Sequence, residues 1–152
     1  MIIRFLLTLL AIACANSALA FKTTEVSIPS ASMNKSYSAT VVIPDSYALS
    51  NKRYPVVYLL HGYGGNYQSW AKNSAVEAFA DQHQLIIVMP DGNIGSWYID
   101  SPVKPNSRFE TYIYKDVISH IDKYYRSIKH KNARAISGFS MGCFGALNIA
   151  LN

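Results

Sequence analysis

The chain has 152 residues, of which 50% are apolar and 12% aromatic, so it can bury the core of one domain. This composition excludes an intrinsically disordered chain, which is too hydrophilic to form a packed core. Fourteen basic and nine acidic residues give a formal net charge of +5. The densest basic stretch is Lys129–Lys131, which indicates a solvated loop rather than a nucleic-acid-binding surface.

The first twenty residues have the pattern of a secretory signal peptide. Arg4 is followed by an apolar run from Phe5 to Ala15, and Ala18–Ala20 has the small-x-small pattern that a signal peptidase reads. The run is too short to span a membrane, and no other segment is long and apolar enough to do so. We therefore expect a signal peptide at residues 1–20.

Cleavage there would leave a mature domain at residues 21–152, beginning at Phe21, in a secreted or periplasmic location. Lipid anchoring at Cys14 is the alternative, although the residues before it match a lipobox poorly. One cysteine, Cys143, would remain, so we expect no internal disulfide.

The first half of the domain alternates between predicted strands and a predicted helix. A β-branched strand at Ser36–Pro44 has a partner in the "TTEVSIP" stretch before it. The continuous apolar runs Val56–Leu60 and Leu85–Pro90 are typical of strands buried on both faces. Between them, Ser74–Gln84 has the apolar spacing of a helix, with Val76, Phe79 and Ala80 on one face.

The second half continues the alternation. A loop at Asp91–Ser107 precedes a helix at Arg108–Tyr125, whose apolar face contains Phe109, Ile113, Val117, Ile121 and Tyr124. "ARAIS" (133–137) is a third buried strand, and a helix begins at Met141. This order predicts an α/β fold, with a mainly parallel sheet, helices on both faces and an antiparallel pair extending one edge.

Ligands bind such sheets at the carboxyl ends of the strands, where the sequence places a Gly-x-Ser-x-Gly motif. Ser140 lies between Gly138 and Gly142, after a strand and before a helix, as in a nucleophile elbow. The two glycines would fit the tight turn, and the helix N-terminus would direct N–H groups at the reacting oxygen. A glycine-rich turn without chemistry is the alternative.

A serine nucleophile also needs an oxyanion hole with two donors. The backbone N–H of Met141, next to the serine, is one candidate. The second is the N–H of Tyr63, in a glycine-rich loop that follows another strand and contains His61, Gly62, Gly64 and Gly65. An ordinary glycine-rich turn is again the alternative.

Together, "YPVVYLLHGYGGNYQSW" and "ISGFSMGCFGA" resemble the secreted branch of the α/β-hydrolase superfamily that contains esterase D, feruloyl and acetyl esterases and mycolyltransferases. Further stretches resemble it in order, among them "LIIVMPDGN" and "GSWYIDSP". The resemblance implies an α/β-hydrolase fold, Ser140 as nucleophile, and Tyr63 and Met141 as oxyanion donors, with no metal or organic cofactor. Many relatives have a small residue where this chain has Cys143, which we expect to be tolerated.

In the α/β-hydrolase order the acid and the histidine follow the serine, and neither residue type follows Ser140 here. We therefore expect the N-terminal half of a protein of roughly 250–280 residues, truncated after the nucleophile helix. Of the four histidines, His83, His120 and His130 fall on or beyond helices and are interpreted as surface or packing residues. His61 is interpreted as structural. The chain by itself is expected to be poorly soluble and inactive on p-nitrophenyl acetate.

The leading functional hypothesis is a secreted serine carboxylesterase that forms an acyl-enzyme at Ser140. Its substrate would be a small-molecule or carbohydrate ester, such as a feruloyl or acetyl group on a plant polysaccharide. Trp70, Trp97 and Tyr98 either form an aromatic wall for this substrate or pack beneath the loops. Acyl transfer to a sugar hydroxyl and a non-catalytic carbohydrate-binding relic are the alternatives.

Overall fold

A computed structural model of the protein describes residues 22–152. The predicted signal peptide at residues 1–20, the mature start at Phe21 and the alternative lipid site at Cys14 lie outside the described residues. Within the described part, no helix is long and apolar enough to cross a membrane.

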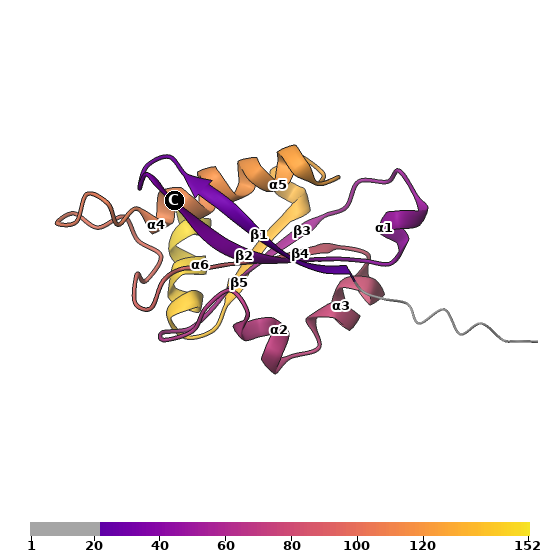
Figure 1. The fold of residues 1–152 in the computed structure, drawn as a ribbon, viewed down its shortest axis with the longest axis horizontal. Helices are drawn as coiled ribbons and strands as arrows, with labels where there is room; N and C mark the ends of the chain where they lie inside the picture. The colour runs from indigo at the N-terminus through magenta and orange to yellow at the C-terminus, as the bar shows by residue number, and fades with distance from the viewer. Residues whose placement is uncertain (1–21) are drawn as a thin grey trace, which may run out of the picture.

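One five-stranded sheet forms the centre of the fold (Figure 1). Its strands are β1 (Lys22–Ser30), β2 (Lys35–Ile43), β3 (Val56–Leu60), β4 (Ile86–Pro90) and β5 (Arg134–Gly138). Their order across the sheet is β1-β2-β4-β3-β5. The pairs β1–β2 and β2–β4 are antiparallel, whereas β3–β4 and β3–β5 are parallel. The sheet is therefore mixed, and the antiparallel hairpin extends one edge as the sequence predicted.

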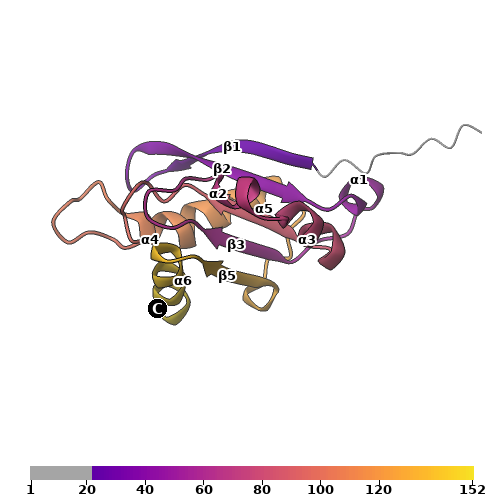
Figure 2. The ribbon, with the colours of Figure 1, turned by 90° about the horizontal axis from the view of Figure 1, so that it is seen from below.

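Helices cover both faces of the sheet, as predicted. Figures 1 and 2 show α2 (Ser69–Asn73) and α3 (Val76–His83) on the face opposite α5 (Ile118–Tyr124). The first pair packs on Val42, Ile87 and Met89. On the other face, α5 and α6 (Met141–Leu151) share one core with Tyr58 and Leu60. The remaining short elements are α1 (Ser46–Leu49) and η2 (Lys131–Ala133).

The helix predicted at Arg108–Tyr125 contains a wider π-helical segment. It runs through α4 (Phe109–Thr111), the π-helix η1 (Tyr112–Val117) and α5. Its apolar residues recur at intervals of four, which is longer than the 3.6 residues of an α-helical turn. The wider segment keeps this set on one face, where Phe109, Ile113, Val117 and Ile121 are buried. Tyr124, predicted on the same face, is 61% exposed.

The β5 strand is not the fully buried strand that its sequence predicted. Its residues alternate between half-buried and exposed, whereas all five residues of β4 are buried. The reason is that only one face of β5 is covered: Ile136 packs against the core that α5 and α6 share, whereas Ala135 is exposed on the other face, where the α2–α3 cluster contains no β5 residue. Among the described residues β5 also pairs with β3 alone.

Candidate active site

The carboxyl ends of β3, β4 and β5 lie side by side, and a functional candidate follows each strand. Ser140 follows β5 and is exposed at the start of α6. Its backbone has φ 53° and ψ −116°, a conformation that costs a non-glycine residue energy and that clusters at functional sites. The predicted strand–serine–helix turn is therefore present and strained.

The two glycines beside Ser140 are required by close backbone contacts. A Cβ atom on Gly138 would lie 2.4 Å from the carbonyl carbon of Gly142, and one on Gly142 would lie 2.2 Å from the carbonyl oxygen of Leu60. Since both neighbours are main-chain atoms, no side-chain rotation could relieve the overlap. The elbow thus packs directly against the end of β3.

The backbone N–H groups of Met141 and Tyr63 are free to act as donors. In the first turn of α6, the Gly142 N–H donates to Phe139 O and the Cys143 N–H donates to Ser140 O, both at 2.9 Å. Neither the Met141 N–H nor the Tyr63 N–H has an acceptor among residues 22–152. Unpaired N–H groups beside a candidate nucleophile are what an oxyanion hole requires.

The loop that carries Tyr63 is fixed by its own backbone bonds. Gly64 has φ +75° and donates its N–H to Ile94 O at 2.9 Å, and the Gly65 N–H donates to Gly62 O at 3.0 Å. Gly62 contacts the elbow, because a Cβ there would lie 3.1 Å from the Phe139 ring. These contacts connect the 61–65 loop both to the loop after β4 and to the elbow.

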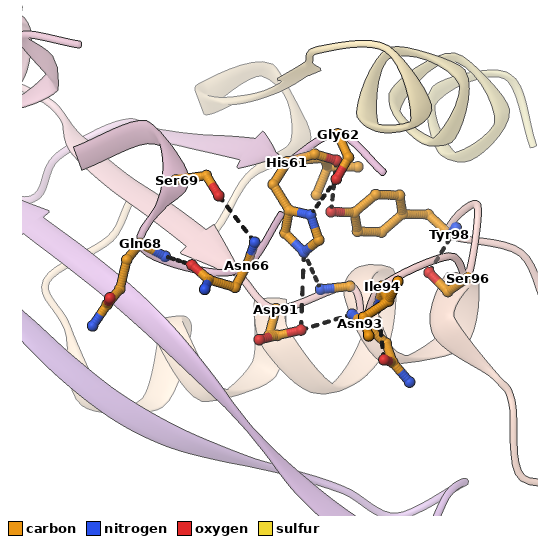
Figure 3. A network of polar contacts seen from close by, with 12 residues as sticks. His61, Gly62, Asn66, Gln68, Ser69, Asp91, Asn93, Ile94, Ser96 and Tyr98 are labelled. Carbon is orange, nitrogen blue, oxygen red and sulfur yellow. Dashed lines mark hydrogen bonds and ion pairs between the residues drawn. The ribbon is translucent and has the colours of Figure 1, made fainter. Parts of the chain in front are cut away.

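The side chain of His61 fixes this loop through hydrogen bonds (Figure 3). Its side chain is buried, and Nε2 accepts the Gly92 N–H at 2.9 Å, which leaves Nδ1 to donate to Gly62 O at 2.8 Å. Both ring nitrogens are therefore occupied in one neutral tautomer. This arrangement agrees with the structural role expected for His61 and leaves no nitrogen free to accept a proton from Ser140.

Asp91 lies beside this imidazole, 3.9 Å from His61 Nε2, and accepts the Asn93 N–H at 2.7 Å. Burial by itself raises the pKa of the Asp91 carboxyl, but hydrogen bonds to the carboxylate, among them the one from the Asn93 N–H, lower the pKa by more, so that it lies below its ordinary value. The contacts that Asp91 and Gly92 make with His61 were not predicted from the sequence. The only indication in the sequence is that His61 follows one predicted buried strand and that Asp91 and Gly92 follow the next one.

The three aromatic residues proposed as a substrate wall differ in position. Tyr98 is fully buried, and its ring fills the space beside Gly92 and Gly145, so the packing alternative describes it. Trp97 is 46% exposed and meets Phe144 edge to face at 5.7 Å between centroids. Trp70 is half-buried and donates its indole N–H to Leu60 O at 3.1 Å.

A mainly apolar cavity of about 370 Å³ opens beside the 61–65 loop. Tyr63, Trp70 and Phe139 are among its walls, and Tyr63 is 69% exposed. Phe139 immediately precedes Ser140, so the cavity lies close to the candidate nucleophile. Phe139 was not predicted as a wall of this cavity, because the direction of its side chain depends on the strained backbone at Ser140.

Comparisons with known proteins identify the family of this chain. The family model named Esterase, with the description "Putative esterase", matches residues 30–152. The chain belongs to the Esterase family. Within it, the chain is 37% identical over 115 residues to an esterase of Mycobacterium tuberculosis, a match that covers 72% of this chain and 25% of that protein. It is 28% identical over 95 residues to an acetyl esterase of Caldicellulosiruptor saccharolyticus, which covers 62% of this chain and 35% of that protein.

Solved structures of esterases have the same fold. A ferulic acid esterase matches with a TM-score of 0.76 and 34% identity, covering 86% of this chain and 52% of that structure. The predicted α/β-hydrolase fold and the resemblance to this esterase branch are thus confirmed. The chain spans about half the length of that solved esterase and 25% of the mycobacterial relative.

The other three histidines belong to elements outside the elbow, whereas Cys143 lies in the first turn of α6. His83 ends α3 and packs on Phe79, and His120 packs on Tyr124 of α5, with ring centroids 4.2 and 4.6 Å apart. His130 accepts the Asn132 N–H at the start of η2. Cys143 is exposed as a free thiol. Among residues 22–152, no three His, Cys, Asp or Glu side chains gather as metal ligands.

Proposed function

We propose that this chain carries the nucleophile and the oxyanion hole of a secreted serine esterase. The observation that carries the proposal is the exposed Ser140 at φ 53°, next to the unpaired N–H of Met141 and opposite the loop that holds the unpaired N–H of Tyr63. Membership of the Esterase family supports ester hydrolysis as the chemistry.

In the proposed reaction, Ser140 Oγ attacks the ester carbonyl carbon while a general base takes its proton. The Met141 and Tyr63 N–H groups stabilise the negative oxygen of the tetrahedral intermediate. The base then returns the proton to the leaving alcohol, and an acyl-enzyme remains. Water, deprotonated by the same base, attacks the acyl-enzyme and releases the carboxylic acid and free Ser140.

The general base and its acid partner come from outside residues 22–152. His61 has both ring nitrogens occupied, and the other three histidines belong to the surfaces of α3, α5 and η2. A serine hydroxyl without a base is protonated at neutral pH and is a weak nucleophile. The 152-residue chain alone is therefore inactive on p-nitrophenyl acetate in this proposal.

The proposed substrates are esters of a carboxylic acid with a carbohydrate, the acyl group being feruloyl or acetyl. Similarity to a ferulic acid esterase and to an acetyl esterase supports both acyl groups. The apolar cavity with Tyr63, Trp70 and Phe139 suits an acyl chain or aryl ring. Trp97, in the loop after β4, is exposed and packs against Phe144 of α6.

The test is hydrolysis of methyl ferulate and p-nitrophenyl acetate by the product of the complete gene. Ser140→Ala is expected to reduce kcat by about 10⁴-fold or more and to abolish labelling by a fluorophosphonate. Ser137→Ala, which removes another exposed hydroxyl three residues earlier on β5, is the matched control and keeps full activity. Labelling of the Ser140→Ala variant at the parental rate would refute Ser140 as nucleophile.

Two further measurements separate the alternatives. If a sugar hydroxyl outcompetes water for the acyl-enzyme, the product is a new sugar ester and the protein is an acyltransferase. If a feruloylated oligosaccharide binds without turnover or labelling of Ser140, the protein is a binding module.

A further inference from the structure

A second hollow, of about 390 Å³, lies between the turn that joins β1 to β2 and the loop after β4. Most of its exposed lining is polar, in contrast to the apolar cavity beside the 61–65 loop. We call it the polar hollow, and its walls include Lys35, Tyr37, Asn93, Ser96, Lys104 and Asn106.

The polar hollow is positively charged. Lys35 and Lys104 are the charged residues in its walls, both are exposed, and neither has a carboxylate within 4 Å among residues 22–152. The neighbouring acids are engaged elsewhere: Asp91 accepts the Asn93 N–H, and Asp100 pairs with Arg108 at 3.0 Å. Two cations without carboxylate partners therefore face a hollow that can take an anion.

Hydrogen-bond donors and an aromatic floor accompany the two cations. The Asn93 Oδ1 atom accepts the Ile94 N–H, which leaves the side-chain NH₂ group for a ligand. Ser96 Oγ accepts the Tyr98 N–H and keeps its own hydrogen to donate. The rings of Tyr37 and Phe109, which also line the polar hollow, meet edge to face with their centroids 5.1 Å apart. Cations, hydroxyl-binding groups and a ring surface match a carbohydrate that bears a carboxylate.

The polar hollow adjoins the proposed oxyanion loop through one residue. Tyr63 is a wall of the apolar cavity, and a Cβ on Gly95, in the wall of the polar hollow, would lie 2.9 Å from the Tyr63 ring. The Ile94 carbonyl also accepts the Gly64 N–H. The loop after β4 thus contacts the oxyanion loop and forms part of the polar hollow. An apolar acyl group suits the first cavity, and a polar alcohol suits the second.

We propose that the polar hollow binds a hexuronate unit in the carbohydrate alcohol of the substrate, with Lys35 and Lys104 binding its carboxylate. The placement on the alcohol side rests on the esterase function proposed above, whereas hexuronate binding itself does not require catalysis.

The direct test is an equilibrium titration of the full-length protein with D-glucuronate, with D-glucose as the neutral comparison. The Ser140→Ala variant is used so that binding is measured without turnover. We expect D-glucuronate to bind, to weaken as NaCl rises from 50 to 500 mM, and to bind at least tenfold more tightly than glucose. Equal affinity for the two sugars would overturn the proposal.

Substitution of the two lysines tests whether glucuronate binds in the polar hollow. Lys35→Gln combined with Lys104→Gln is expected to weaken glucuronate binding at least tenfold. Lys129→Gln, at an exposed position outside the polar hollow, removes a like charge and is expected to leave binding within twofold. An equal effect of the double variant and Lys129→Gln would show that only net charge matters, and would also overturn the proposal. Unchanged thermal melting of each variant confirms that the fold is retained.

A kinetic comparison tests the alcohol-side placement. With acetylated xylo-oligosaccharides as substrates, the double lysine variant is expected to lose kcat/KM at least tenfold only where the oligosaccharide bears a glucuronate. Equal losses on neutral and acidic substrates would overturn the placement. A catalytically inactive protein that still binds glucuronate would refute the esterase function and leave the hexuronate site standing.

Discussion

The hydroxyl of Tyr98 donates a hydrogen bond to the backbone carbonyl of His61 at 3.2 Å, and both residues are buried (Figure 3). Burial raises the pKa of Tyr98 far above its ordinary value, so the hydroxyl remains a donor at every physiological pH. The same ring packs on Gly145 of α6. One side chain therefore contacts both the loop that carries Tyr63 and the helix that begins at Met141.

Replacing Tyr98 with phenylalanine tests this contact. Tyr98→Phe keeps the ring but leaves the buried His61 carbonyl without the Tyr98 hydroxyl, so the free energy of unfolding should fall by about 1–3 kcal/mol. Urea denaturation measures the change. The control is Tyr114→Phe. Because the side chain of Tyr114 is half exposed, the free energy of unfolding of this variant should fall by less than about 0.5 kcal/mol. Equal losses in the two variants would mean that the buried bond contributes nothing.

The close approach of α6 to β3 predicts different effects at two glycines. In Gly142→Ala the new methyl group meets Leu60 O at 2.2 Å, so the elbow must move, and we expect at least about 2 kcal/mol of destabilisation. Gly64→Ala meets nothing within 4 Å and carries only the cost of its positive φ, about 1–2 kcal/mol.

The two glycine variants should also differ in their activity on esters. For the complete gene product, Gly142→Ala should abolish ester hydrolysis, since it displaces the Ser140 and Met141 backbone. Gly64→Ala should retain measurable turnover at a temperature where both variants are folded. Full activity of Gly142→Ala would show that the elbow tolerates this shift.

Ionisation of Asp91 should make the free energy of unfolding depend on pH in the acidic range. Because its folded pKa is below the unfolded value, the carboxylate stabilises the fold above its unfolded pKa, roughly 3.9. This contribution is lost as the pH falls through the lower folded pKa. Asp91→Asn should therefore be less stable than the parent chain at pH 7, and the difference should shrink below about pH 4.

Urea denaturation of both chains at pH 7, 5 and 3 checks this prediction. A stability difference that is the same at all three pH values would assign the effect to hydrogen-bond geometry rather than to charge.

The sequence pattern was sufficient to predict those parts of the site that lie within a single strand–turn–helix unit. Val56–Leu60 and Leu85–Pro90 are apolar without interruption because helices cover both faces of β3 and β4. The spacing of Gly138, Ser140 and Gly142 follows from a backbone contact with β3, so the elbow was predictable.

The contacts between units were not predictable in the same way. The bonds from Gly92 to His61 and from Tyr98 to His61 join residues 31 and 37 positions apart, and they form only because β4 lies beside β3. No local pattern encodes that neighbourhood. For the same reason the burial of Tyr98 became evident only in the folded chain.

The outer side of α6 is expected to make the 152-residue chain self-associate. Phe144, Leu147 and Leu151 are 48%, 59% and 83% exposed, and they lie beside the edge strand β5, which has a free pairing edge among the described residues. Exposed apolar surface next to an unpaired strand edge favours association. Leu147→Glu combined with Leu151→Glu should therefore lower the apparent mass measured by size-exclusion chromatography with light scattering.

The matched control is Leu49→Glu, because Leu49 is also 83% exposed but lies on the separate short helix α1. It adds a negative charge without altering α6, so the concentration dependence of the apparent mass should match that of the parent chain. A parent chain that is monomeric at every concentration would contradict the prediction. An equal reduction by Leu49→Glu would show that net charge, and not the surface of α6, governs the association.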